Sequence, residues 1–414
     1  MDATIKTFLL ILKAALNNGQ ADLDMEISPD EWQKLFRLAS IHKVLPLFYE
    51  AVYTNPSLMK IQPLMASVKQ HVMQQVVTQT MCTSEFLELN NRLQAAGIRP
   101  LVVKGIICRN LYWKPDHRPS GDEDVLIPPE RFNLCHRVLT DFGMQTTTAP
   151  ENISSAYEIP YRKAGCSLHI ELHKHLFPPE SEAYGDMNRF FDGVFDRAIS
   201  ENIQGKAVYT MAPTDHLFYL ICHAFKHFLH SGFGIRQVCD IVLYANEYGN
   251  QIDWPGILKH CEAIRADKFA AALFQIGKNY LVFDPDKACY PNSWRAIHVD
   301  EIPMLEDLLS GGLYGDASMS RKHSSNITLD AVVAQKKGQR AKGAILATVF
   351  PAASQLEGKY PYLKKHPYLI PVAWGSRIWN FARESRNSRN NNASDALTIG
   401  NERLALMKIY GILK

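Results

Sequence analysis

The sequence lacks the features by which membrane-spanning, disulfide-bonded and zinc-ribbon proteins are recognised. No apolar run reaches the roughly 18 residues that a spanning helix requires, and the apolar start of the chain, residues 5–12, lacks the cleavage pattern of a signal peptide. The eight cysteines are scattered without a Cys-x-x-Cys pair, which favours a reducing compartment. We therefore expect a cytoplasmic protein with no membrane partner.

An excess of charge of one sign is also missing. The chain has 45 Lys and Arg against 42 Asp and Glu, a formal net charge of +3. Nucleic-acid-binding domains usually carry a clustered basic excess, and a local basic cluster such as residues 336–342 is better explained as a solvated surface. This balance argues against nucleic acid as a partner. With 414 residues, of which 46% are hydrophobic, the chain can form two or three domains with a substantial core.

Hydrophobic periodicity divides the chain into regions of different type. Residues 1–95 have helical spacing, and Ser28-Pro29-Asp30-Glu31 has the N-cap, proline and glutamate that open a helix. Residues 96–212 alternate strand and helix patterns, residues 213–384 are helical again, and residues 385–414 combine a polar, low-complexity, flexible linker with a terminal helix. We therefore predict an α+β fold in which a small mixed β-sheet, with helices on one face, is flanked by N- and C-terminal helical regions. The predicted elements include helices at residues 63–96, 106–112 and 128–143 and strands at 144–148, 156–162, 167–173 and 207–211.

The most informative segment is residues 118–127, in which two aspartates precede an apolar strand. Because residues i and i+2 of a strand point the same way, Asp122 and Asp124 face one side and Glu123 the other. Two carboxylates this close repel each other unless a cation lies between them, and hard divalent ions suit them. An isolated Asp-x-Asp is more often a solvated turn, so the surrounding motifs decide its meaning.

A second motif lies upstream, where a β-branched strand at residues 98–103 ends at Lys104 and Gly105. A helix is predicted to begin at Ile106. A strand, a glycine turn and a helix N-terminus together present backbone N–H groups to an anion. Lys104 adds a mobile positive charge, so we expect phosphate contacts at this turn.

A third carboxylate, Glu171, lies further along the chain, in a segment where apolar and polar residues alternate strictly. If its strand neighbours the aspartate strand, Glu171 completes a three-carboxylate cage of the kind that holds two metal ions about 3.5–4 Å apart. We therefore predict Asp122, Asp124 and Glu171 as the catalytic metal ligands, with Mg²⁺ or Mn²⁺ as the ion. The alternation puts Leu168, Ile170 and Leu172 on one side of this strand and His169, Glu171, His173 and His175 on the other.

In this order the motifs resemble the polymerase-beta-like nucleotidyltransferase superfamily, and more closely a bacterial family of uncharacterised nucleotidyltransferases. That family carries a Lys-Gly pair after the first strand, an Arg-x-x-Gly-Asp-x-Asp strand and a later acidic-x-His strand. The resemblance extends to a downstream helical pattern and to a C-terminal block from Phe350 to Arg377, so it covers most of the chain from about residue 96. The matching residues are Lys104, Gly105, Arg118, Gly121, Asp122, Asp124, Glu171 and His173, followed by His223, His227, Arg236 and Asp240.

The resemblance implies an α+β nucleotidyltransferase core that transfers a nucleotidyl group from a nucleoside triphosphate to an acceptor, with release of pyrophosphate. Relatives of this kind modify proteins, peptides or small molecules, and neither the acceptor nor the preferred base can be read from the sequence. The triphosphate-binding residues that it implies are Lys104, Gly105, Arg118, Gly121, His173, His223, His227, Arg236 and Asp240.

Two residues depart from the pattern of these relatives. The superfamily places a serine after the glycine, where its hydroxyl contacts a phosphate, and this chain has Ile106. We expect Lys104 and backbone N–H groups to make that contact instead. Glu123 stands where the closer family has an aliphatic residue, and we expect it at the exposed edge of the strand.

Several of these residues also have ordinary structural interpretations. Arg118 could form a structural ion pair with one of the two aspartates, and His173 could merely cover a sheet edge. Arg236 and Asp240 have the spacing of a surface ion pair on a helix. Four histidines of the helix that begins at Pro213 fall within a ~60° arc, a face that could bind metal, contact phosphate or be half-buried: His216, His223, His227 and His230.

Two other classes of function remain open. A metal-dependent hydrolase could use the strand with His169, Glu171 and His173, since Zn²⁺ favours imidazole with carboxylate. Same-face strand positions about 6–7 Å apart are too widely spaced to hold one ion easily. A non-catalytic binding protein on the same fold is the other, although retained carboxylates that repel each other argue against it.

Overall fold

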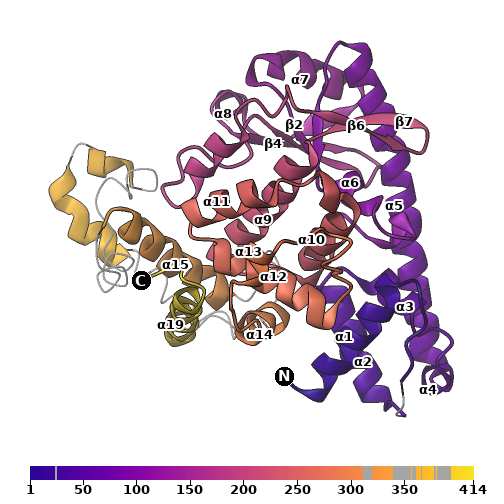
Figure 1. The fold of residues 1–414 in the computed structure, drawn as a ribbon. Coiled ribbons are helices and arrows are strands. Elements are labelled where there is room, and N and C mark those ends of the chain that lie inside the picture. The colour runs from indigo at the N-terminus through magenta and orange to yellow at the C-terminus, as the bar shows by residue number, and fades with distance from the viewer. Residues whose placement is uncertain are drawn as a thin grey trace. The chain divides into compact units, whose positions relative to one another are not determined.

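The computed structural model describes residues 1–23, 26–310, 319–338, 356, 360–364, 366–376, 379 and 393–414 (Figure 1). These residues form two compact units, one of residues 1–224 and 234–305 and the other of residues 225–233 and 306–414. The four-region division of the sequence stays a prediction. The predicted linker lies outside the described residues as far as residue 392, as do Phe350 and Arg377 at the ends of the predicted C-terminal block.

Helices dominate the first 95 residues, as predicted. The Ser28 side chain accepts a hydrogen bond from the Glu31 backbone N–H, and Pro29 occupies the first turn of α2. The long α5 ends before Gly97, whose φ of +76° suits only glycine at low cost. The helices are α1 (Ala3–Leu16), α2 (Pro29–Ile41), α3 (Leu45–Glu50), α4 (Pro56–Met59) and α5 (Gln62–Ala95).

A five-stranded mixed sheet follows, in the order β1-β2-β5-β4-β3. β2 and β5 pair in parallel, and the other neighbours pair antiparallel. A separate hairpin contains β6, which the sequence patterns did not indicate, and β7. The predicted α+β class with a small mixed sheet is confirmed. The strands are β1 (Leu101–Val103), β2 (Glu123–Leu126), β3 (Met144–Thr146), β4 (Glu158–Lys163), β5 (His169–His173), β6 (Ile199–Ile203) and β7 (Lys206–Thr210).

Short helices connect the strands of the sheet. The helix predicted at residues 106–112 is a single short one, α6 (Gly105–Arg109), and the next predicted helix is α7 (Phe132–Asp141), which ends before Gly143. The other connections are α8 (Pro150–Ile153) and the 3₁₀ turns η1 (Pro115–His117), η2 (Pro129–Arg131) and η3 (Gly185–Phe191).

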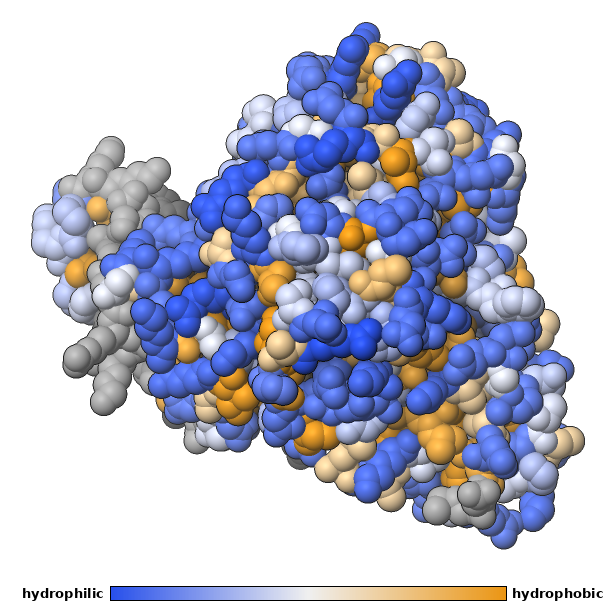
Figure 2. Space-filling model, in the orientation of Figure 1, coloured by the Kyte–Doolittle hydropathy of each residue, from blue (hydrophilic) through white to orange (hydrophobic). Residues whose placement is uncertain are grey.

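The remainder of the described chain is again helical. α9 (Pro213–His230) begins in the first unit and ends in the second. Within the part of the chain that the structure describes, no helix is both long and apolar enough to cross a membrane. The face in Figure 2 is largely hydrophilic, with smaller hydrophobic areas between. The helices after α9 are α10 (Ile235–Tyr248), α11 (Trp254–Ala263), α12 (Asp267–Tyr280), α13 (Asn292–Arg295), α14 (Ile302–Ser310), α15 (Met319–Lys336) and α19 (Ala393–Ile409), with 3₁₀ turns η4 (Gly249–Gln251), η6 (Pro361–Lys364) and η7 (Pro367–Leu369).

Candidate active site

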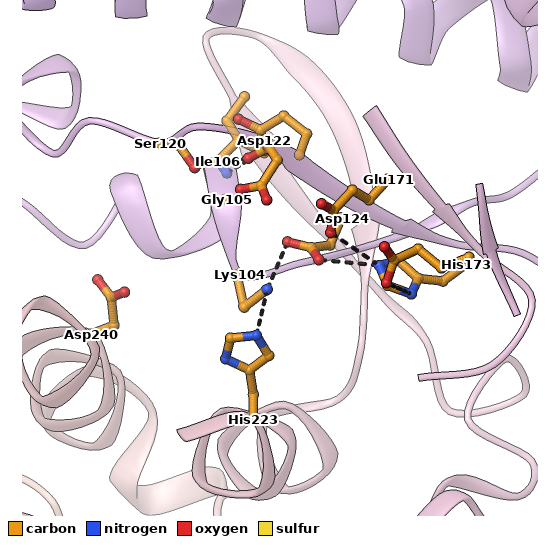
Figure 3. A network of polar contacts seen from close by, with 12 residues as sticks. Lys104, Gly105, Ile106, Ser120, Asp122, Asp124, Glu171, His173, His223 and Asp240 are labelled. Carbon is orange, nitrogen blue, oxygen red and sulfur yellow. Dashed lines mark hydrogen bonds and ion pairs between the residues drawn. The ribbon is translucent and has the colours of Figure 1, made fainter. Parts of the chain in front are cut away.

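The parallel pairing of β2 with β5 brings two of the predicted carboxylates together. Asp124 lies directly opposite Glu171 in this register, and parallel partners point to the same face. With His173 they offer ligand atoms that all lie within 4.8 Å of one another. Figure 3 shows this group with Asp122 beside it. Asp122 precedes β2 and is half-buried, and it is not part of that compact group.

Asp124 is the centre of the arrangement. Its Oδ2 lies 2.9 Å from Lys104 Nζ, and its Oδ1 lies 3.1 Å from His173 Nε2. Burial opposes the charged form of this carboxyl, but Lys104 and His173 outweigh it and hold the pKa of Asp124 well below its ordinary value. Burial likewise opposes the ammonium, yet Asp124 raises the pKa of Lys104. The two groups therefore form a buried ion pair at neutral pH.

Glu171 behaves in the opposite way. Burial, followed by repulsion from Asp124 and Asp122, raises the pKa of Glu171 to about 9. Burial and the neighbouring carboxylates keep this carboxyl protonated, as is typical of a group of carboxyls that can bind a cation. Cation binding would release the proton.

Lys104 is held from two directions by α9. Its Nζ lies 2.9 Å from His223 Nε2, as Figure 3 shows, and its backbone N–H donates to His216 Nε2 at 3.1 Å. The Lys104 backbone has φ +61° and ψ −121°, a conformation that residues with a side chain rarely adopt. The lysine is thus placed by its surroundings rather than by its own preference.

Glu123 corrects a prediction from the sequence. It is not at an exposed edge: only 2% of it is exposed. Its Oε1 lies 2.5 Å from Arg109 Nη2, and its Oε2 accepts the Ile106 backbone N–H at 2.8 Å. A Cβ at Gly105 would lie 1.9 Å from the same oxygen, so only glycine fits there.

This carboxylate changes the expectation for phosphate binding. The Ile106 N–H at the start of α6 was predicted to be available to an anion, but Glu123 already accepts from it. Glu123, the residue between the two aspartates, begins β2, and its side chain reaches the start of α6. Of the groups expected to contact phosphate at this turn, the Ile106 N–H is therefore already used within the protein.

Arg118, Asp240 and Arg236 surround the loop that leads to Asp122. Arg118 donates to Asp240 through Nε at 2.9 Å and Nη2 at 2.5 Å, and Tyr112 also donates to Asp240, at 2.8 Å. Arg236 donates to the Pro119 carbonyl oxygen. The alternative interpretations as a surface pair on α10, or as a pair between Arg118 and one of the two site aspartates, are therefore wrong. These residues anchor the loop instead.

The other predicted residues lie outside the compact group of Asp124, Glu171 and His173. Gly121 lies in the loop before β2 and is exposed, and His223 contacts Lys104. His227 belongs to the second unit. His169 and His175 flank the group on the chain without joining it.

Sequence reasoning did not select several residues that the structure brings to the site. His216 was grouped with its neighbours on the helix face but not chosen, although it shares that face with His223. Glu158 lies opposite His173 in the β4–β5 register, with Oε2 at 3.7 Å from His173 Nδ1. Strand pairing was the missing information, because β4 shows no acidic motif of its own.

The donor set fits a divalent cation. Two carboxylates suit Mg²⁺ or Mn²⁺, whereas an imidazole nitrogen suits Zn²⁺ and its neighbours. His173 can therefore serve as a ligand or as the hydrogen-bond donor that orients Asp124, a common role beside metal-binding carboxylates.

The chain resembles known proteins at the level of a family and of a solved structure. Among curated proteins none matches the chain. A solved structure, an antigenic nucleotidyltransferase-like protein from Paracoccidioides brasiliensis, matches at 14% identity with a TM-score of 0.31, over 50% of this chain and 96% of that one. The family described as "Uncharacterised nucleotidyltransferase" matches residues 28–281, more than half of the chain. This protein belongs to that nucleotidyltransferase family.

Proposed function

We propose that the chain is a metal-dependent nucleotidyltransferase that moves a nucleoside monophosphate group from a nucleoside triphosphate to an acceptor and releases pyrophosphate. One observation carries the proposal: Asp124 lies opposite Glu171 in paired strands, with Lys104 against the same carboxylate. Paired carboxylates beside a lysine offer a cation site and a positive charge, the two things that triphosphate chemistry needs. Family membership supports the same reaction.

In this proposal Asp122, Asp124 and Glu171 ligate Mg²⁺ or Mn²⁺. When bound, two such ions neutralise the triphosphate and lower the pKa of the acceptor hydroxyl. Lys104 supplies positive charge to the departing pyrophosphate, and His173 orients Asp124. Such catalysis depends on placement and electrostatics more than on a strong base.

The other family residues act through position. Asp240 holds Arg118, and Arg236 holds the carbonyl of Pro119, so these residues set the loop with Gly121 in front of Asp122. Gly105 leaves room for Glu123 beneath the turn. His223 acts through Lys104, and His227 stays a proposed triphosphate contact on the same helix.

The order of the motifs favours the polymerase-beta-like superfamily and, within it, a bacterial family. The eight cysteines all lie among the described residues and are free, which favours a reducing, cytoplasmic location. A protein, a peptide or a small molecule is the favoured class of acceptor, since the chain lacks the basic excess of a nucleic-acid binder.

The test is a transfer assay with the purified chain, each of the four α-labelled nucleoside triphosphates, and Mg²⁺ or Mn²⁺. A desalted cell extract and its small-molecule fraction serve separately as acceptor sources. Labelled product and pyrophosphate are expected. Asp124→Asn and Glu171→Gln should lower turnover by about 100-fold or more.

Matched controls use the same substitutions at exposed positions. Asp141→Asn at the end of α7 and Glu130→Gln in η2 should keep wild-type turnover. Circular dichroism and thermal unfolding confirm that each variant is folded. Wild-type turnover by the Asp124 and Glu171 variants would rule out this assignment.

One observation favours a second candidate, a metal-dependent hydrolase. The compact ligand group contains an imidazole as well as carboxylates, which is the donor chemistry of catalytic zinc. The sequence suggested that one strand, with His169, Glu171 and His173, would hold this metal. In the structure the ligand group comes from two strands, β2 and β5, and does not include His169. Metal analysis distinguishes the candidates, because one tightly held zinc per chain supports hydrolysis and a weak Mg²⁺ requirement supports nucleotidyl transfer.

A further inference from the structure

The backbone of Lys104 is an unusual feature of the site. Its φ of +61° is sterically unfavourable for a residue with a side chain, and such strain persists only where neighbouring groups impose it. The Lys104 carbonyl accepts from Cys108 N at 2.9 Å, in the first turn of α6. Its N–H points the other way and donates to His216 Nε2 at 3.1 Å. The imidazole therefore constrains the strained residue directly.

The hydrogen bonds around His216 determine its tautomer. Thr210 donates its one hydroxyl proton to the Val102 carbonyl oxygen at 2.7 Å. The contact of 3.2 Å between Thr210 Oγ1 and His216 Nδ1 must then have the ring as donor. Nδ1 carries the proton, and Nε2 keeps the lone pair that accepts from Lys104. In the other tautomer, Nε2–H would face the Lys104 N–H, and Nδ1 would face a hydroxyl oxygen whose proton is already donated to Val102.

The imidazole ring of His216 is enclosed by the protein. His216 is fully buried, and its ring centroid lies 4.8 Å from that of Tyr244. Burial lowers the pKa of His216 to about 3, so the imidazole stays neutral and remains an acceptor. The Val102 carbonyl and the Lys104 N–H, on either side of Val103, thus both end at the same Thr210–His216 pair.

We propose that His216 is a positioning residue for Lys104. Its Nε2 holds the Lys104 backbone in the positive-φ conformation from which the ammonium reaches Asp124. His223, which contacts Lys104 Nζ, lies two turns further along α9. The inference rests on the proposed function, because the ammonium so placed is the one that meets the triphosphate. His216 itself touches no reacting atom.

Two substitutions separate the contact from the bulk of the ring. In His216→Gln the amide oxygen reaches about as far as Nε2 and can still accept the Lys104 N–H. In His216→Asn the amide reaches only as far as Nδ1, so Thr210 keeps a partner and Lys104 loses its acceptor. Both variants lose the ring packing against Tyr244, so that loss is common to the two.

The first readout is hydrogen exchange, measured by mass spectrometry on a peptide that contains Lys104. Exchange of this amide should be faster in His216→Asn by about 10-fold or more and close to wild type in His216→Gln. Equal exchange in the two variants would overturn the proposal. This readout needs no nucleotide, so it decides even if the wild-type chain transfers none and the proposed function fails.

The second readout is turnover. His216→Asn should lower kcat by about 10- to 100-fold with little change in KM, since a displacement of about 1 Å has that effect, while His216→Gln stays within about 3-fold. In a Lys104→Met background, His216→Asn should add less than about 3-fold, because its effect passes through the lysine. Equal losses in both His216 variants, additive with Lys104→Met, would indicate a merely structural role and refute the proposal.

Discussion

Among single residues, Glu123 separates this chain from the pattern that its motifs suggested. The carboxylate lies beneath the start of α6, where it accepts the Ile106 N–H and pairs with Arg109. A strand residue that points away from the metal site can therefore still shape it. Its position determines which groups remain free for phosphate and which residue can stand at 105.

The glycine at 105 should be the least replaceable one near the site. Gly105→Ala would put a methyl group 1.9 Å from Glu123 Oε2 at a φ of +30°, so we expect a loss of at least ~2 kcal/mol in unfolding free energy, measured by urea unfolding. Gly121→Ala is the control, because no atom lies within 4 Å of its Cβ position. Equal stability of the two variants would contradict the close approach.

The buried pair of Glu123 with Arg109 should be replaceable only as a unit. Glu123→Leu leaves a guanidinium that is 1% exposed without its partner, which should cost about 3–5 kcal/mol. Adding Arg109→Met should recover most of that loss, since an apolar pair of similar volume carries no unpaired charge. Guanidinium chloride unfolding of the single and double variants measures the recovery.

The control for this pair lies on the surface of α5. Glu88 and Arg92 form an ion pair 2.5 Å long whose side chains are about half exposed. Glu88→Leu should change stability by less than ~0.5 kcal/mol. A double variant at 109 and 123 no more stable than Glu123→Leu alone would mean that the lost acceptor of Ile106 N–H, and not the charge, dominates.

At the scale of elements, alternation predicted β5 well. Leu168, Ile170 and Leu172 are buried, and Glu171 faces the site, because strict period-two patterns need no long-range information. β6 was missed, since Ile-Ser-Glu-Asn-Ile has apolar residues only at its ends. Its pairing with β7, and the pairing of β4 that brings Glu158 to His173, depend on contacts that a single strand does not encode.

α9 illustrates the same limit in a helix. The shared face of its histidines was visible in the sequence, but their partners were not. His216 meets Lys104 and Thr210, and His223 meets the lysine side chain. Which histidine becomes an acceptor, and which contacts an ammonium, follows from the tertiary position of β1.

This buried histidine should make stability depend on acidity. Burial lowers the pKa of His216 from 6.5 to about 3, so below pH 6.5 the unfolded chain binds a proton that the folded chain refuses. Stability should therefore fall with falling pH by up to ~1.4 kcal/mol per pH unit down to about pH 3, with no contribution above 6.5. His216→Gln should flatten the curve in urea unfolding between pH 4.5 and 7.5.

Burial also lowers the pKa of other histidines, such as His230 to about 4, so the test compares variants with one another. His298→Gln replaces an exposed histidine and should leave the wild-type pH dependence in place. If His216→Gln and His298→Gln gave curves parallel to wild type, His216 would be protonated in the folded chain. Its role as an acceptor for Lys104 would then be lost.

At the scale of the whole chain, the second unit combines residues far apart in sequence. The short segment 225–233, which includes the end of α9, clusters with residues 306–414. The sequence predicts a terminal helix within residues 385–414, but it could not indicate what α15 and α19 cap. The carbonyls at a helix C-terminus lack intrahelical donors, and here the donors come from side chains about 90 to 175 residues away.

Those donors form a tertiary cap on α9. Arg403 of α19 donates to the carbonyls of Phe228 and His230, and it lies over the Phe228 ring at 6.0 Å. Thr328 of α15 donates to the Leu229 carbonyl at 2.6 Å, and Arg321 to that of Ser231. Removing a hydrogen-bond donor from a buried carbonyl costs about 1–3 kcal/mol.

Replacing Arg403 should therefore destabilise the second unit more than replacing an exposed residue of α19. Arg403→Ala leaves two carbonyls without their donor, and we expect a loss of ~2–4 kcal/mol, seen as faster hydrogen exchange across residues 225–233 and 319–336. Arg403→Lys should recover less than half of it, because one ammonium cannot bridge two carbonyls and lie flat on a ring. Lys408→Ala, at an exposed position of the same helix, should exchange like wild type. Unchanged exchange in Arg403→Ala would mean that packing between α15 and α19, and not this cap, stabilises the unit.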